Sequence, residues 1–295
     1  MSGRRFGGVF APITTPLDPV SGDLAPVALR GNIARLLGEG LNGIVVAGST
    51  GEAPLLDAEE QRRLVAVARA AVPTDRWLLA GTGGESTREA IARSRAAAAE
   101  GADAVLVRPP GYYSAAMTPP ALSEYFRAVA DACPVPVLVY NIPKYTHVAI
   151  PPAVLEQLAT HANILGVKDS SGDVKNLGAY RAAVPRWSVF VGSGSLLFAA
   201  LELGCDGGIL ALACFAGRRC AEVYAVYRSG DHSRAGVLQE PLVPLDKEIV
   251  GKLGPAGVKA AMDVVGLAGG PVRAPLAPLS PADRARVARL LTPGD

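Results

Sequence analysis

Eight short apolar segments recur along this chain, and most of the segments between them are long enough to form a helix. The apolar segments are residues 9–13, 43–47, 77–80, 104–107, 135–140, 164–168, 188–191 and 208–212. Most of them are continuously apolar, which is typical of strands buried on both faces of a parallel sheet. Eight such units predict an α/β fold, a (β/α)8 TIM barrel, with a doubly wound sheet as the alternative.

A short corner motif is repeated three times and supports this prediction. Each copy runs Gly-x-Asn or Gly-x-Asp before an apolar segment, at residues 40–42, 101–103 and 204–206. Glycine adopts the left-handed conformation that ends a helix, and Asn or Asp then favours a tight turn into the strand. Two helix starts are also predicted, where Asp57 precedes Glu60 and Ser86 precedes Glu89 in the spacing of a capping box.

The strand pattern stops near Ala216, and the rest of the chain predicts helices separated by Gly and Pro. We therefore expect residues 1–215 to form the barrel core. Residues 216–295 would form the last barrel helix and a C-terminal helical region within the same structural unit. A length of 295 residues suits one barrel with additions.

Composition excludes several classes of protein. The 29 basic and 27 acidic residues leave a net charge of +2 without a basic block, which argues against nucleic-acid and membrane-surface partners. No apolar run approaches the roughly 18 residues of a membrane span, and the N-terminus lacks the apolar core of a secretory signal. Three histidines and four cysteines fall in no metal-binding or disulfide pattern. We expect a cytoplasmic protein without a metal or another cofactor.

Two polar residues close neighbouring apolar segments, where a parallel barrel places its active site. Lys168 ends one segment and Tyr140 ends the segment before it. An ammonium there is costly unless it is paired or neutral, and only the neutral amine attacks a carbonyl carbon. A phenol beside it can move protons during such a reaction. The structural alternatives are an ion pair of Lys168 with Asp169 or another carboxylate at the barrel rim, and a Tyr140 hydroxyl bonded to the backbone.

Two glycine- and serine-rich loops follow other predicted strands. GSTGE, at residues 48–52, offers hydroxyls and successive N–H groups that suit a carboxylate or a phosphate. GSGS, at residues 192–195, is similar. Neither is a P-loop or a dinucleotide fingerprint, and loops of this composition are common in barrels. The pair Tyr112–Tyr113 follows the fourth segment and could line the pocket or a subunit contact, although packing is the better explanation from these residues alone.

Taken together, these motifs resemble the dihydrodipicolinate synthase / N-acetylneuraminate lyase superfamily of pyruvate-dependent class I aldolases. The resemblance spans nearly the whole chain, through FAPITTP (10–16), GSTGE (48–52), PGYY (110–113), YNIP (140–143) and GVKDSSGD (166–173). It implies a TIM barrel with a helical C-terminal region, a small-molecule substrate and a homotetramer built as a dimer of dimers.

The resemblance also implies roles for individual residues. Lys168 would form the Schiff base, with Tyr140, Thr50 and Tyr112 as a proton relay in which Tyr112 serves the neighbouring subunit's site. The residues expected to bind substrate are Ser49, Thr50, Ser170, Gly192 and Ile209.

The substrate is the finer question. Synthases of the superfamily that use aspartate semialdehyde carry an arginine five residues after the tyrosine, where this chain has Tyr145. The run KDSSGD, residues 168–173, and the tail of residues 257–276, from GVK to GGPVRAPL, look more like 4-hydroxy-2-oxoglutarate aldolases.

The leading expectation is therefore a Schiff-base lyase that cleaves a 4-hydroxy-2-oxo acid to pyruvate and an aldehyde such as glyoxylate. The alternative is a 4-hydroxy-tetrahydrodipicolinate synthase, which condenses pyruvate with aspartate semialdehyde. Sugar-acid dehydratases and sialic-acid-type lyases share the lysine and tyrosine and stay open. A barrel without catalytic activity that acts as a binding protein, and a metal-dependent aldolase, are further alternatives.

Overall fold

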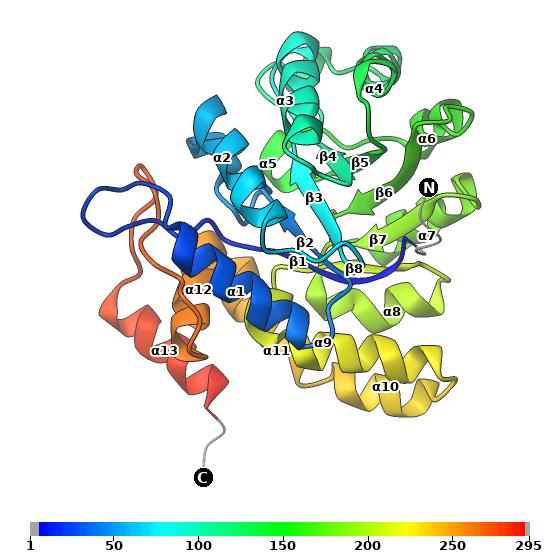
Figure 1. Cartoon of the computed structure of the whole chain (residues 1–295). Coiled ribbons are helices and arrows are strands. Elements are labelled where there is room, and N and C mark those ends of the chain that lie inside the picture. Colours follow the sequence, from blue (N-terminus) through cyan, green and yellow to red (C-terminus); the bar gives the residue numbers. More distant parts are fainter. Residues whose placement is uncertain (1–5, 293–295) are drawn as a thin grey trace.

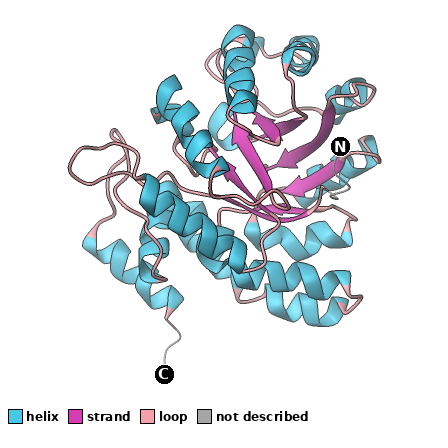
Figure 2. Ribbon diagram, in the orientation of Figure 1, coloured by secondary structure: helices cyan, strands magenta, loops and turns pink. Residues whose placement is uncertain are grey.

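Eight parallel strands close into a barrel in the computed structural model, which describes residues 6–292. The strands are β1 (Gly8–Pro12), β2 (Gly43–Val46), β3 (Trp77–Gly81), β4 (Ala104–Val107), β5 (Val137–Asn141), β6 (Ile164–Asp169), β7 (Ser188–Val191) and β8 (Gly207–Ile209). Each pairs with its neighbour in chain order, and β8 pairs with β1. The TIM-barrel prediction is confirmed, and the doubly wound alternative is wrong (Figures 1 and 2).

Helices surround the strands. Those between strands are α1 (Pro26–Gly38), α2 (Ala58–Arg69), α3 (Thr87–Ala99), α4 (Pro119–Ala132), α5 (Pro143–Thr146), α6 (Pro152–Leu158), α7 (Val174–Ala183) and α8 (Leu197–Glu202), with short 3₁₀ turns η1 (Ala53–Leu55), η2 (Ser114–Ala116) and η3 (Gly194–Leu196). After β8 follow α9 (Ala213–Arg228), α10 (His232–Gln239), α11 (Leu242–Leu245), the π-helix η4 (Asp246–Gly251), α12 (Lys252–Val264) and α13 (Pro281–Leu291). The last five elements lie to one side of the barrel (Figure 1).

The predicted strands match the observed ones closely, with one error at the last strand. Residues 208–212 were expected to be extended, but β8 ends at Ile209. Leu212 already has helical backbone angles, because it caps the start of α9. Residues 1–5 and 293–295, which include the start of the N-terminal segment tested for a secretory signal, lie outside the described residues.

In the repeated corner, the glycine has the predicted left-handed conformation, but the Asn or Asp has a different role from the one predicted. Gly40, Gly101 and Gly204 have φ angles of 95°, 92° and 76°, in the left-handed region. The following Asn or Asp side chain accepts a hydrogen bond from a strand that precedes it in the chain. These bonds are Val9 N to Asn42 Oδ1, Leu78 N to Asp103 Oδ2 and Val189 N to Asp206 Oδ2. The corner therefore joins neighbouring strands as well as turning the chain.

One of the two predicted capping boxes is complete. At α2, Asp57 accepts from the Glu60 backbone and Glu60 accepts from the Asp57 backbone. At α3, Ser86 accepts from Glu89 N, but the Glu89 carboxylate accepts from the backbone of Glu85 instead of Ser86. The reciprocal bond expected at α3 is therefore wrong, because the carboxylate reaches one residue further back.

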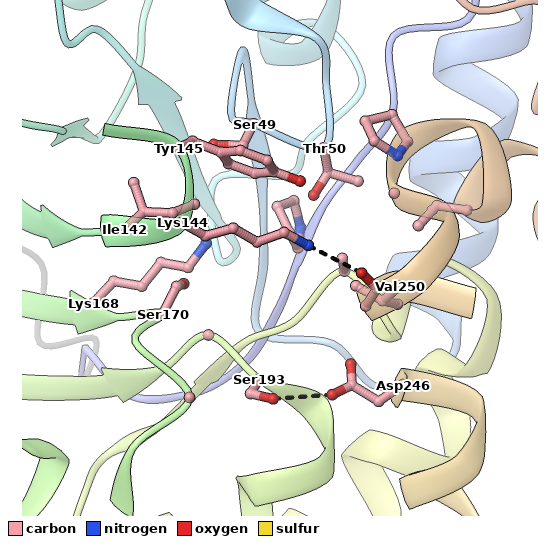
Figure 3. A pocket seen from close by; sticks show the side chains of 18 of the residues that line it. Ser49, Thr50, Ile142, Lys144, Tyr145, Lys168, Ser170, Ser193, Asp246 and Val250 are labelled. Carbon is pink, nitrogen blue, oxygen red and sulfur yellow. Dashed lines mark hydrogen bonds between the residues drawn. The ribbon is translucent and has the colours of Figure 1, made fainter. Parts of the chain in front are cut away.

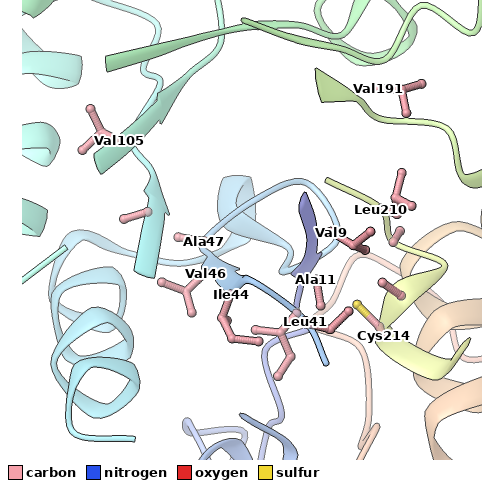
Figure 4. Close-up of a cluster of buried hydrophobic side chains, with 14 of the residues drawn as sticks. Val9, Ala11, Leu41, Ile44, Val46, Ala47, Val105, Val191, Leu210 and Cys214 are labelled. Atoms are coloured by element: carbon pink, nitrogen blue, oxygen red, sulfur yellow. The ribbon is translucent and has the colours of Figure 1, made fainter. Parts of the chain in front are cut away.

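The apolar core has two layers. Inside the barrel, side chains such as Phe10, Leu138, Phe190 and Ile209 fill the space between the strands and form the floor below their carboxyl ends. Outside the barrel, a larger cluster lies between strands and helices; Figure 4 shows its members around β1 and β2, with Cys214 of α9. In barrels of this type, the active site lies at the carboxyl ends of the strands, above such a filled interior.

The four cysteines are free and buried. Burial raises the pKa of the Cys205 and Cys214 thiols to about 12, so both are protonated at pH 8. Since the thiolate is the reactive form, we expect the folded protein to react very slowly with a disulfide reagent at pH 8. All four thiols should react within minutes after unfolding in guanidinium. Rapid reaction of four thiols in the folded protein would contradict the buried placement.

Candidate active site

Lys168 and Tyr140 lie side by side at the carboxyl end of the barrel. They are direct partners in the β5–β6 register, and the Lys168 Nζ is 4.3 Å from the centre of the Tyr140 ring. Each is only 5% exposed, and both line a cavity of about 280 Å³. Residues at adjacent strand ends therefore meet at one small cavity, as the sequence predicted.

The structural alternative for Lys168, an ion pair with Asp169, is not formed. Successive side chains of a strand alternate, so Lys168 points into the barrel and Asp169 points outward. The Asp169 carboxylate accepts hydrogen bonds from the side chains of Asn141, Ser171 and Asn176 and from the Ser171 backbone. Within residues 6–292 the Lys168 ammonium forms no ion pair. The Lys168 side chain is therefore available to a ligand that binds in the cavity.

The loop of residues 48–52 brings Ser49 and Thr50 to the same cavity. Gly51 O accepts from Thr15 Oγ1 at 2.7 Å, and Glu52, at the loop's end, has a φ of 59°. Within residues 6–292 the backbone N–H groups of Ser49 and Thr50 have no acceptor. The loop thus presents two hydroxyls and two N–H groups, a set of donors that suits a carboxylate.

A buried ion pair fixes this loop to the C-terminal region. Glu52 Oε1 lies 2.5 Å from Lys259 Nζ, and the two side chains are 1% and 2% exposed. The other Glu52 oxygen accepts from Arg273 N, and Lys259 also donates to the Pro271 carbonyl. Burial lowers the pKa of Lys259, and the pairing with Glu52 opposes that shift. Sequence reasoning missed this pair, since no local spacing links two residues that far apart.

Two further predicted residues, Ser170 and Gly192, line the cavity, and Ile209 does not. A Cβ atom on Gly192 would lie 1.9 Å from Ser170 Oγ, so only glycine fits beside this serine. Ile209 is fully buried in the apolar floor inside the barrel. The predicted residues Lys168, Tyr140, Ser49, Thr50, Ser170 and Gly192 are therefore brought together.

Tyr112 lies away from this cavity. It is 81% exposed and stacks edge-on against Tyr113, which is 72% exposed. Glu85 holds the loop by accepting from the backbone N–H groups of Gly111 and Tyr112. Within one chain, Tyr112 is therefore not among the described residues that line the Lys168 cavity.

The C-terminal region supplies the remaining wall of the cavity, which sequence reasoning did not predict. Asp246, Val250 and Gly251 of the π-helix η4 line it opposite Lys144 and Tyr145 of α5 (Figure 3). Asp246 accepts hydrogen bonds from Ser193 Oγ and Ser195 N. π-helices are rare in proteins, and those that occur are often found at functional sites. The sequence carries no signal for a π-helix here.

Two negative findings hold for residues 6–292. They contain no group of three or more His, Cys, Asp or Glu side chains that could hold a metal ion. None of the helices they form is long and apolar enough to span a bilayer.

Comparison with known proteins gives consistent matches over the whole chain. A model of the dihydrodipicolinate synthetase family matches residues 5–293. A 4-hydroxy-tetrahydrodipicolinate synthase of Synechococcus sp. (strain CC9311) is 38% identical over 297 residues, covering 99% of this chain and 96% of the relative. One from Methanothrix thermoacetophila is 35% identical over 289 residues, covering 97% and 96%.

Solved structures match equally well. The E. coli K12 prophage protein YagE, described as a member of the dihydrodipicolinic acid synthase family in complex with pyruvate, superposes with a TM-score of 0.91 at 30% identity and 98% coverage of both chains. The dihydrodipicolinate synthase of Acinetobacter baumannii complexed with pyruvate gives 0.92 at 31% identity, covering 97% of this chain and 98% of that one.

Proposed function

Because this chain belongs to the dihydrodipicolinate synthetase family, whose members are pyruvate-dependent Schiff-base lyases, we propose that it makes or breaks a carbon–carbon bond next to a pyruvyl imine on Lys168. The observation that carries the proposal is the Lys168 side chain, which forms no ion pair within residues 6–292 and lies beside Tyr140 at the cavity. The two solved relatives that hold pyruvate support the choice of the first substrate.

The proposed chemistry uses few groups. The neutral Lys168 amine attacks C2 of pyruvate, and loss of water gives the imine. Ser49 and Thr50 hold the pyruvyl carboxylate through the donors of their loop. Tyr140 passes protons to and from the carbinolamine, directly or through Thr50. Loss of a proton from C3 then gives an enamine, which attacks an aldehyde carbon; the reverse sequence cleaves the same bond.

The names of the relatives favour condensation with aspartate semialdehyde, the reaction of a 4-hydroxy-tetrahydrodipicolinate synthase. We propose this reaction first, ahead of the cleavage reaction that the sequence motifs favoured.

Cleavage of a 4-hydroxy-2-oxo acid such as 4-hydroxy-2-oxoglutarate is the second candidate, and one observation favours it. Tyr145 lines the cavity at the position where the synthases carry an arginine, and no arginine is among the described lining residues. Burial raises the pKa of Tyr145, so its phenol is neutral at pH 7. A neutral phenol cannot replace the bidentate contact between a guanidinium and a carboxylate.

Two assays on the same protein separate the candidates. In the first, pyruvate and aspartate semialdehyde are supplied with a dihydrodipicolinate reductase, and oxidation of its nicotinamide cofactor is followed. In the second, 4-hydroxy-2-oxoglutarate is supplied, and pyruvate and glyoxylate are measured. Flux above a boiled-enzyme control in the first assay alone supports the synthase, and flux in the second alone supports the aldolase. If neither assay shows flux above the control, both candidate reactions are rejected.

Removal of the Tyr140 hydroxyl tests the proton-transfer role. Tyr140→Phe is expected to lower kcat by about 10²- to 10⁴-fold, the usual contribution of a positioned acid–base group. The ring remains to fill the barrel interior, so the thermal midpoint should change little. Near-native turnover in this variant would remove Tyr140 from the mechanism.

We also propose a homotetramer arranged as a dimer of dimers, in which Tyr112 completes a neighbouring subunit's site. Its exposure and its distance from the cavity in one chain support this. Residues 1–215 and 216–295 are proposed to act as one unit, because both line the same cavity. The proposed location is the cytoplasm.

A further inference from the structure

Few charged side chains line the cavity, and they differ in whether they already have a partner. Among the described residues that line it, the acidic and basic side chains are Lys144, Lys168 and Asp246. Lys168 is committed to the imine in the proposed function, and Asp246 already accepts from Ser193 and Ser195. Within residues 6–292 the Lys144 ammonium forms no ion pair. Lys144 is therefore the cation that stays available after pyruvate has reacted.

The structure holds this ammonium over the cavity. Lys144 lies on α5, directly after β5, and its Nζ donates to the carbonyl of Gly251 at 3.0 Å. The side chain crosses from α5 towards the C-terminal wall in Figure 3, and its Nζ is 5.5 Å from the centre of the Tyr145 ring. An ammonium has three donors. With one used by Gly251, two are left for a ligand.

We propose that Lys144 binds a second carboxylate, so that this site takes a partner, or a cleavage substrate, with an acid group at the end distant from the Schiff base. The inference rests on the proposed pyruvyl imine at Lys168. Ser49 and Thr50 bind the carboxylate next to the imine, and Lys144 binds the distal one. A lysine serves here as a point charge, without the planar fork of an arginine.

A pair of matched 2-oxo acids tests this without depending on turnover. 2-Oxoglutarate and 2-oxopentanoate have chains of the same length, and only the first has a distal carboxylate. Neither has a 4-hydroxyl group, so an imine with Lys168 cannot be cleaved and can be reduced with borohydride and read by intact mass. The wild type is expected to be half-labelled at a lower concentration of 2-oxoglutarate than of 2-oxopentanoate.

Lys144→Met keeps the aliphatic stem and removes the charge. In this variant, the ratio of the half-labelling concentration of 2-oxopentanoate to that of 2-oxoglutarate is expected to fall by about 10- to 100-fold. A change of this size is the effect of losing one charge-assisted hydrogen bond. Lys144→Arg should retain most of the preference for 2-oxoglutarate. Lys247→Met removes an exposed lysine of the same π-helix that does not line the cavity, and should leave the preference unchanged.

Pyruvate labelling of the wild type distinguishes the failures. If pyruvate gives no adduct, the proposed function fails and this inference falls with it. If pyruvate labels the wild type but the two longer acids are labelled equally, or if Lys144→Met keeps the preference, the role of Lys144 is rejected while the Schiff base stands. An equal loss of the preference in Lys247→Met would also reject the role of Lys144, because the preference would then depend on the total charge of the protein and not on a contact with Lys144.

Discussion

Turnover by the Lys168→Ala variant is expected to fall at least about a thousandfold, because Lys168 is the amine beside Tyr140. The other lysine that lines the cavity, Lys144, is held by the Gly251 carbonyl. The fold should survive the change. The Lys168 side chain is 5% exposed and forms no ion pair within residues 6–292, so the variant loses no ionic partner. The measurement is kcat in whichever of the two assays the wild type supports, with the thermal midpoint of each protein.

Two comparison variants make the result specific. Lys168→Arg keeps the charge but offers no neutral amine, so it should be as inactive as Lys168→Ala. Lys175→Ala removes an exposed lysine at the start of α7 and should behave as the wild type. More than a tenth of wild-type activity in either Lys168 variant would contradict a covalent role for this residue.

Glu52→Gln is expected to lower the free energy of unfolding by about 3–5 kcal/mol, because it leaves the buried Lys259 ammonium without its counter-charge. It should also raise the KM for pyruvate, since Glu52 ends the loop that carries Ser49 and Thr50. Denaturant unfolding and steady-state kinetics on the same protein measure the two effects. Lys259→Met should give a loss of similar size.

The double variant and an exposed pair serve as controls. Glu52→Gln combined with Lys259→Met removes both charges and should be more stable than the sum of the single losses predicts. Glu59→Gln breaks an exposed pair with Arg62 and should leave the unfolding midpoint within error. Additive losses in the double variant would show that the two side chains do not act as a pair.

The fold was predictable because local signals repeat in it. Strands are specified by continuous apolar segments, and corners by left-handed glycines such as Gly40 and Gly101. Both signals depend only on residues that are close together in the sequence. Lys168 and Tyr140 were predictable for the same reason. The end of a strand is a local feature, and barrel topology then places neighbouring strand ends together.

The remainder of the site depends on contacts between distant parts of the chain. The Glu52–Lys259 pair and the Lys144–Gly251 hydrogen bond both join the barrel to the C-terminal helices, and no spacing rule reveals them. The π-helix Asp246–Gly251 has no sequence signature either. Ile209 was expected to line the cavity, but it packs with Phe10 and Phe190 in the apolar layer inside the barrel and is not among the lining residues.

Reductive trapping of pyruvate shows whether Lys168 forms the covalent imine. The wild type is incubated with pyruvate and borohydride, its intact mass is measured, and the modified peptide is sequenced by fragmentation. We expect a single pyruvyl adduct per chain on Lys168 and none on Lys144, with no adduct in Lys168→Ala. A folded wild type that gives no adduct, or an adduct on another lysine, would contradict this expectation.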